Sequence, residues 1–215
     1  MRYKTFVCMN IAIIGTGKNC EALAKGLAAA GHEVFIGMKS ISGNGQVSHK
    51  LLEAYENIYI TTVHDAAVEA DVILITTPAT EVREVAYMLD DVRKKTIIDL
   101  SSFNFVRHNK HINTYNAIKA ITGSQNIVKC YNVTGYEDLV NPEIHEDNTD
   151  MFIAGDSKKS KEMVKLLARD IGFVNCFDFG DYETVPMLDH MSECWNNRAV
   201  KQKVQASLAY KLVAR

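Results

Sequence analysis

Short apolar runs alternate with amphipathic stretches along most of this chain of 215 residues. Ile11–Ile14 and Val72–Ile75 are continuous apolar runs, and an alanine-rich stretch with helical spacing follows the first of them. Apolar runs of this kind suit parallel strands that helices cover on both faces. The alternation therefore predicts an α/β, Rossmann-type fold with a doubly wound, mostly parallel sheet and a small C-terminal α/β extension.

The same pattern gives the expected bounds of the elements. After Ile11–Ile14, strands are expected at Val34–Ile36, Tyr59–Thr62, Asp71–Pro78, Thr96–Leu100, Asn126–Tyr131, Met151–Ala154 and Phe173–Phe177. After the alanine-rich stretch, helices are expected at about Gln46–Tyr55, Thr80–Leu89, Tyr115–Ile121 and Ser157–Ile171 with Ser157 near its N-cap, and a short amphipathic segment at His64–Ala70. The last stretch, Tyr182–Val213, is expected to be one long or kinked helix with Pro186 in its first turn. We expect a dinucleotide-binding domain over residues 1–125 and an extension over 126–215 that completes a substrate crevice.

The first strand stops at the glycine turn Gly15-Thr16-Gly17, which opens the alanine-rich helix. Glycines in such a turn let the backbone approach a ligand, and the amides at the helix N-terminus favour a diphosphate. Cys20 stands where the dinucleotide fingerprint has its third glycine or alanine, but cysteine is small and buries readily. The turn predicts dinucleotide binding; the alternative is an ordinary bend between strand and helix.

The end of the second strand indicates which dinucleotide is favoured. Sites specific for NAD often have an acidic residue there to bind the ribose 2′-hydroxyl, whereas NADP sites have cationic and hydroxyl groups for the 2′-phosphate. Here the acid is missing and Lys39 and Ser40 are present. The segment favours NADP, and the alternative is that Lys39 is an ordinary surface lysine.

Two later strands finish in small polar residues. Thr76, Thr77 and Pro78 end one strand, and Asp99 and Ser101 end the next. An α/β sheet binds its ligand at the carboxyl ends of its strands. We therefore expect Thr76, Thr77 and Pro78 to lie beside the nicotinamide half of the cofactor, and Ser101 to take part in the same crevice.

Composition narrows the classes of partner and compartment. Apolar residues make up 47% of the chain, charged residues 23%, and the formal net charge is −2, which predicts neither nucleic-acid nor membrane binding. The five cysteines are scattered and odd in number, so reduced thiols in a cytoplasmic protein are expected. His108 and His111 have no carboxylate or cysteine at matching spacing, so no metal site is expected. Met1 and Met9 both remain candidates for the natural start.

Several separated stretches resemble one family, the NADPH-dependent reductases of the deazaflavin coenzyme F420. The stretches are GTGKNC…GLAAAGHEVFIGMKS (Gly15–Ser40), ADVILITTP (Ala70–Pro78), TIIDLSS (Thr96–Ser102), VKCYNVTG (Val128–Gly135) and MFIAGDSKKSKEMVKLLARDIGF (Met151–Phe173). The resemblance runs from Met9 to about Trp195. It departs from the family at Cys20, Met38 and Ser40, where the family more often has glycine, serine and arginine.

The resemblance implies roles for individual residues. Phosphate contacts would come from Thr16, Gly17, Lys18 and Asn19, contacts with the 2′-phosphate from Met38, Lys39 and Ser40, and contacts with the nicotinamide half from Thr77 and Pro78. Asn132 and Thr134 would line the substrate crevice. Trp195 is not implied by the resemblance, but its side chain could border the same crevice. The implied protein is a homodimer that uses NADPH and a small-molecule acceptor.

The expected function is hydride transfer between NADP(H) and a flat acceptor such as a deazaflavin or flavin. The nicotinamide cofactor carries out the hydride transfer itself, and the residues indicate no catalytic acid or base. Two alternatives remain open. One is a dehydrogenase of small metabolites, of the imine- or hydroxyacid-reducing type, and the other is a regulatory module that binds NADP without turnover.

Overall fold

The computed structural model describes residues 8–40, 47–101, 113–132, 150–196 and 211–212, and all structural statements below concern these parts. The strands are β1 (Asn10–Ile14), β2 (Glu33–Met38), β3 (Ile58–Thr62), β4 (Val72–Ile75), β5 (Thr96–Asp99), β6 (Ile127–Asn132), β7 (Asp150–Ala154) and β8 (Asn175–Asp178). The α-helices are α1 (Lys18–Ala29), α2 (His49–Ala54), α3 (Val63–Glu69), α4 (Val82–Met88), α5 (Thr114–Thr122), α7 (Lys158–Asp170) and α8 (Val185–Asn196). Two short 3₁₀ turns, η1 (Ala79–Glu81) and η2 (Tyr182–Thr184), precede α4 and α8.

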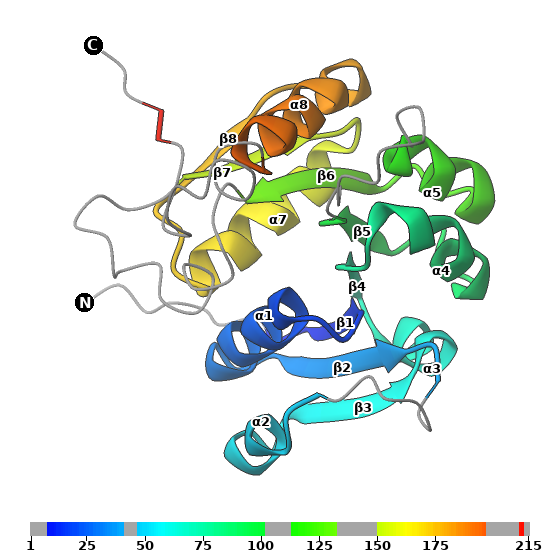
Figure 1. Cartoon of the computed structure of the whole chain (residues 1–215), viewed down its shortest axis with the longest axis vertical. Helices are drawn as coiled ribbons and strands as arrows, with labels where there is room; N and C mark the ends of the chain where they lie inside the picture. Colours follow the sequence, from blue (N-terminus) through cyan, green and yellow to red (C-terminus); the bar gives the residue numbers. More distant parts are fainter. Residues whose placement is uncertain (1–7, 41–46, 102–112, 133–149, 197–210, 213–215) are drawn as a thin grey trace.

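The eight strands of the described residues form one sheet, in the order β3-β2-β1-β4-β5-β6-β7-β8 (Figure 1). Every neighbouring pair is parallel except β6 and β7, which run antiparallel. From β1 the chain adds β2 and β3 on one side and then β4 and β5 on the other, and this reversal of strand order between β1 and β4 is the switch point at which doubly wound folds bind their ligands. The predicted Rossmann-type, mostly parallel sheet is confirmed.

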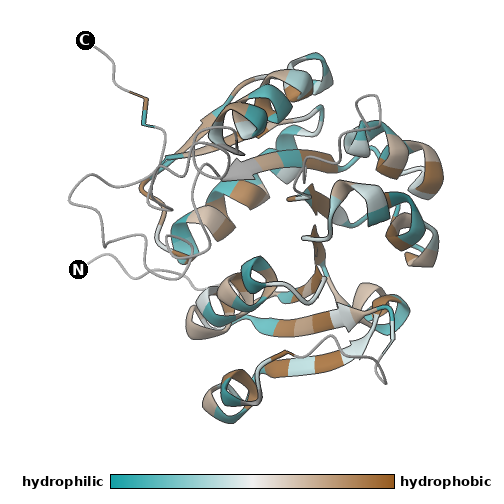
Figure 2. Cartoon of the chain, in the orientation of Figure 1, coloured by the Kyte–Doolittle hydropathy of each residue, from teal (hydrophilic) through white to brown (hydrophobic). Residues whose placement is uncertain are grey.

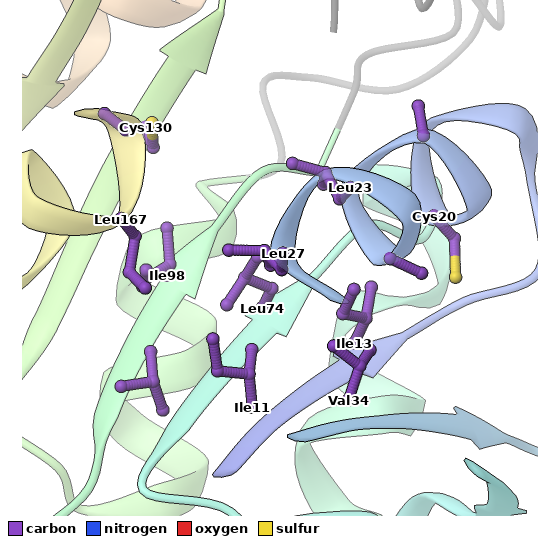
Figure 3. Close-up of a cluster of buried hydrophobic side chains, with 14 of the residues drawn as sticks. Ile11, Ile13, Cys20, Leu23, Leu27, Val34, Leu74, Ile98, Cys130 and Leu167 are labelled. Carbon is purple, nitrogen blue, oxygen red and sulfur yellow. The ribbon is translucent and has the colours of Figure 1, made fainter. Parts of the chain in front are cut away.

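Helices cover both faces of the sheet, and each face has its own apolar core. Figure 3 shows the core under α1 and α7, where Leu23 and Leu27 of α1 and Leu167 of α7 lie against Leu74 and Ile98 of the strands. Figure 2 shows that brown, apolar residues also fill the central strands. The second core is built from the opposite side chains of the same strands together with α3, α4, α5 and α8. The continuous apolar runs exist because both sides of these strands are buried.

The last three strands continue the sheet of the first five. β6 pairs with β5, and residues of β6, β7 and α7 share the apolar core of α1. His32, buried before β2, accepts a hydrogen bond from the Met9 amide at Nδ1 (3.3 Å), so its Nε2 carries the proton and donates to Asp170 of α7 (3.3 Å). The two segments, residues 1–125 and 126–215, both contribute strands to this one sheet. Their division into two domains stays a prediction.

Three expected helices differ in detail. The helix expected from Thr80 begins as the turn η1 and becomes α-helical only at Val82, after Pro78. The expected Gln46–Tyr55 helix is the shorter α2. The final helix begins as η2 and has Pro186 in the first turn of α8. The predicted end of this helix at Val213 is wrong, because Lys211 and Leu212 are not helical; residues 197–210 and 213 lie outside the described part. Ser157 caps α7 as expected, since its hydroxyl accepts from the Ser160 amide.

A buried cluster of charges joins β5, β6, α5 and α8. Lys129 Nζ lies 3.1 Å from Asp99 Oδ2 and 3.5 Å from Asp189 Oδ1, and Lys129 and Asp99 are almost fully buried. Thr114 Oγ1 of α5 donates to the same Asp99 oxygen at 2.6 Å. Burial by itself lowers the pKa of Lys129, but the two carboxylates outweigh burial and raise it. Lys129 therefore stays charged and connects the sheet to α8.

Within the described ranges, none of the helices combines the length and the apolar character that crossing a membrane requires.

Replacing Lys129 with methionine removes this charge and leaves the fully buried carboxylate of Asp99 uncompensated. We expect the free energy of unfolding to fall by about 3–5 kcal/mol, as measured by urea denaturation. Lys165→Met, which breaks the exposed pair with Glu162 (2.7 Å), is the matched control and should cost less than about 1 kcal/mol. Equal losses in the two variants would contradict a structural role for the buried cluster.

Candidate nucleotide-binding site

A pocket of about 800 Å³ lies at the carboxyl ends of β1, β2 and β4, beside the N-terminus of α1. This is the position at which the strand order reverses, between β1 and β4. The lining residues come from four short segments: Ile14, Gly15, Thr16, Gly17, Lys18 and Asn19; Gly37, Met38, Lys39 and Ser40; Thr76, Thr77 and Pro78; and Glu81.

Backbone contacts at Gly15 hold the three strand ends together. The Thr76 amide and hydroxyl both donate to the Ile14 carbonyl, at 2.9 and 3.0 Å, and the Gly15 amide donates to Gly37 O at 3.2 Å. Gly15 has φ +144°, and a Cβ there would overlap Thr76 Oγ1. The fold therefore requires glycine at this position.

The second glycine of the turn has a different explanation. Gly17 is the N-cap of α1 with φ −82° and ψ 175°, a conformation open to any residue, and a Cβ there would meet no atom within 4 Å. Among the described residues, no side-chain hydrogen bond caps α1 at Gly17, and the first amides of any α-helix have no partner within the helix itself. The fold alone does not need this glycine. A diphosphate that approaches the backbone closely at a helix N-terminus does.

Thr77 carries the second sign of a ligand. Its side chain is 6% exposed and lines the pocket, yet among the described residues its Oγ1 has no hydrogen-bond partner. Leaving a buried hydroxyl unpaired costs about 1–3 kcal/mol. A ligand with a hydroxyl or amide in the pocket would supply the missing partner.

Cys20 packs into the core rather than facing the pocket. It is fully buried among the residues under α1, near Ile13 and Leu23 (Figure 3). Burial, with a smaller contribution from Glu21, raises the pKa of its thiol to about 12, so the thiol is neutral at physiological pH. The side chain takes the packing role of the small third residue in the fingerprint.

Lys39, the residue on which the NADP preference rests, is not isolated at the pocket. Its Nζ lies 2.7 Å from Glu81 Oε2 and 3.0 Å from Glu84 Oε2. Hydrogen bonds to Glu81 and Glu84 raise the pKa of Lys39, so it is charged but already engaged by two carboxylates.

The structure brings together all the predicted cofactor residues except one. Ser101 is not among the lining residues, because its amide and hydroxyl both donate to Asp99 Oδ1 at the end of β5. The sequence shows only a small polar residue at a strand end, so the hydrogen bonds from Ser101 to Asp99 could not be inferred from it. Sequence reasoning in turn missed Ile14, Gly37 and Glu81.

Gly37 directly precedes the predicted segment Met38–Ser40. A Cβ there would lie 2.6 Å from Ile14 Cδ1 and 3.1 Å from Ala66 Cβ, so this glycine lets α3 pack closely. The charge of Lys129 was also missed. The available signal was a lysine inside the apolar strand of the VKCYNVTG stretch.

The predicted substrate residues are only partly within the described chain. Asn132 is the last residue of β6, and its side chain lies outside the described part, as do Thr134, His108 and His111. Trp195 is half-buried on α8 against the second apolar core, away from the lining of the pocket. Among the described residues, no three His, Cys, Asp or Glu side chains are grouped as metal ligands.

Residues 10–102 match the family model of NADP oxidoreductases, coenzyme F420-dependent. A curated F420-dependent NADP reductase from Methanothermobacter thermautotrophicus is 26% identical and covers 92% of both chains. The resemblance to this family that the sequence predicts is confirmed.

Solved structures show the same fold. A protein from Arthrobacter sp. FB24 assigned as an F420-dependent NADP reductase superposes with a TM-score of 0.83 at 20% identity, over 96% of this chain and 100% of that one. A variant of an imine reductase from Myxococcus stipitatus, in complex with NAD+, has a TM-score of 0.65 at 15% identity, over 92% of this chain and 62% of that one.

The two glycines of the turn should respond differently to alanine. Gly15→Ala forces an overlap at positive φ and should lower the free energy of unfolding by about 2 kcal/mol or more. Gly17→Ala should change it by less than about 1 kcal/mol, because no atom is displaced. Urea denaturation measures both.

Nucleotide binding gives the second half of this test. Gly17→Ala should weaken NADP+ binding at least tenfold in calorimetry if a diphosphate approaches the backbone here, because the added Cβ would occupy open space beside the N-terminus of α1. Unchanged NADP+ affinity in the Gly17 variant would place the diphosphate elsewhere.

Proposed function

We propose that this protein is an NADP(H)-dependent oxidoreductase that transfers hydride between the nicotinamide and a flat acceptor such as the deazaflavin F420 or a flavin. The observation that carries the proposal is the pocket itself: Gly17 leaves open space at the N-terminus of α1, and the unpaired Thr77 hydroxyl lies in the same pocket. The family model and the curated relative agree with an NADP oxidoreductase.

Each segment of the pocket suits a different part of the cofactor. The Thr16–Asn19 turn and the α1 amides would hold the diphosphate, and Met38, Lys39 and Ser40 would face the adenosine 2′-phosphate. Thr76, Thr77 and Pro78 would lie along the nicotinamide half. When bound, the nicotinamide supplies or accepts the hydride.

The contribution of the protein is then to position the two reactants. The strand ends are tied together at Gly15, so the turn and the Thr77 segment form a rigid surface. Holding two reactants in the correct geometry is one of the largest contributions to a bimolecular rate. We assign no catalytic acid or base.

For the acceptor, we propose a crevice beside the Thr77 segment, completed by residues 126–215. Asn132, Thr134 and Trp195 remain the candidate residues. Ser101 remains a proposed contact of the cofactor, although its amide and hydroxyl both donate to Asp99 Oδ1.

One alternative is a small-metabolite dehydrogenase of the imine or hydroxyacid type, which would reduce an imine or a 2-oxo acid. Structures of this type share the fold, but this chain covers 62% of the imine reductase chain, compared with 92% of the curated F420-dependent relative. The other alternative, a non-enzymatic module, predicts NADP binding without turnover.

We also propose that the protein acts in the cytoplasm as a homodimer and binds no nucleic acid. The scattered cysteines and the net charge of −2 support the compartment and the absence of a polyanion partner. The exposed side chains of Tyr182 and Met187, at the start of the C-terminal helical segment, favour a contact between copies. Sedimentation velocity would measure the oligomeric state directly.

The direct test of function is a turnover assay with NADPH and, in separate reactions, F420, a free flavin, an imine and a 2-oxo acid. We expect loss of nicotinamide absorbance with the deazaflavin or the flavin. Turnover of only the imine or the oxo acid would support the dehydrogenase alternative. NADPH binding without any turnover would support the regulatory module.

Thr77→Val tests the unpaired hydroxyl at nearly constant shape. The free energy of unfolding should stay equal or rise by up to about 1 kcal/mol, because a buried polar group without a partner is removed. NADP+ affinity should fall about tenfold, since the ligand loses its hydrogen bond. An unchanged affinity would remove Thr77 from the contacts of the cofactor.

A further inference from the structure

The pocket does contain a carboxylate, although none follows β2 directly. Glu81 belongs to η1, which follows β4, and it lines the same pocket as Lys39 and Ser40. In NAD sites a carboxylate near this end of the pocket accepts the ribose 2′-hydroxyl. The pocket therefore holds both kinds of group, a cation suited to a 2′-phosphate and a carboxylate suited to a 2′-hydroxyl.

The two groups are in direct contact. Lys39 Nζ lies 2.7 Å from Glu81 Oε2, and their side chains are 37% and 38% exposed. Glu84 lies 3.0 Å from the same nitrogen but is 63% exposed and is not part of the lining. Glu81 is thus the carboxylate that faces the pocket, and Glu84 is a solvated second partner of the lysine.

The ion pair between Lys39 and Glu81 changes the charges that a 2′-phosphate would encounter in the pocket. A phosphate that approaches Lys39 has to replace at least one carboxylate, and it also brings negative charge close to Glu81. A ribose with a free 2′-hydroxyl carries no such charge and can donate a hydrogen bond to a carboxylate. Compared with an isolated lysine, the ion pair would therefore weaken NADP binding and reduce its advantage over NAD.

We propose that Glu81 is a specificity-determining residue that competes with the 2′-phosphate for Lys39 and relaxes the preference for NADP over NAD. This inference rests on the proposed nucleotide-binding function. It deepens that function by assigning the balance between the two cofactors to an ion pair that bridges the ends of β2 and β4.

Glu81→Gln tests the proposal with little change in shape at a partly exposed position. Calorimetry on the full-length protein would give the dissociation constants of NADP+ and NAD+. We expect NADP+ to bind about fivefold more tightly and NAD+ about two- to threefold more weakly, so that the preference ratio rises about tenfold. Glu84→Gln should raise the ratio about twofold, because this carboxylate is more solvated.

The Lys39→Ala background shows whether Glu81 acts through the lysine. In that background the gain in NADP+ affinity from Glu81→Gln should shrink at least threefold, since no cation is left to release. Glu162→Gln is the matched control, because it breaks the exposed pair with Lys165 (2.7 Å), which does not line the pocket. This control should leave both dissociation constants unchanged.

Two results would overturn the proposal. One is a preference ratio that rises less than threefold in Glu81→Gln, and the other is an undiminished effect in the Lys39→Ala background. Failure of the proposed function is a separate result, because the wild-type protein would then bind neither NADP+ nor NAD+. Circular dichroism melting of each variant confirms that the comparison is made between folded proteins.

Discussion

The Ile14 carbonyl accepts two hydrogen bonds from Thr76, and this close contact between β1 and β4 determines the geometry of the site. Gly15 permits the contact, because any side chain there would occupy the space of the Thr76 hydroxyl. The Gly15 amide also donates to Gly37 O near the end of β2, so the ends of β1, β2 and β4 lie together at this turn. All the cofactor contacts proposed above depend on this arrangement of the three strand ends.

Two kinds of buried polar group in this sheet have different roles. Asp99 and Lys129 satisfy one another, with Thr114 and Ser101, and the result is a fixed connection between β5, β6 and α5. Thr77, on the neighbouring strand end, lacks such a partner among the described residues. The satisfied group explains architecture, whereas the unsatisfied one indicates where a ligand completes the structure. Ser101 belongs to the first kind, although its position on a strand end resembles that of Thr77.

Sequence patterns were sufficient for the fold because the strands are apolar on both sides and the glycine turn has a defined place between strand and helix. They were sufficient for the segments Gly15–Asn19, Met38–Ser40 and Thr76–Pro78 because these segments follow strands directly. Ser101 and Glu81 show what could not be predicted from the sequence. Whether a hydroxyl is engaged by a carboxylate, or whether a glutamate from η1 reaches a lysine after β2, depends on distances between elements that the order of residues does not contain.

The most direct measurement is the structure of the protein crystallised with NADP+. Our account predicts the diphosphate against Gly17 and the first amides of α1, the nicotinamide half within hydrogen-bond distance of Thr77 Oγ1, and the 2′-phosphate beside Lys39 with Glu81 displaced from the lysine. A nucleotide bound outside this pocket, or one whose diphosphate leaves the space at Gly17 unfilled, would contradict it.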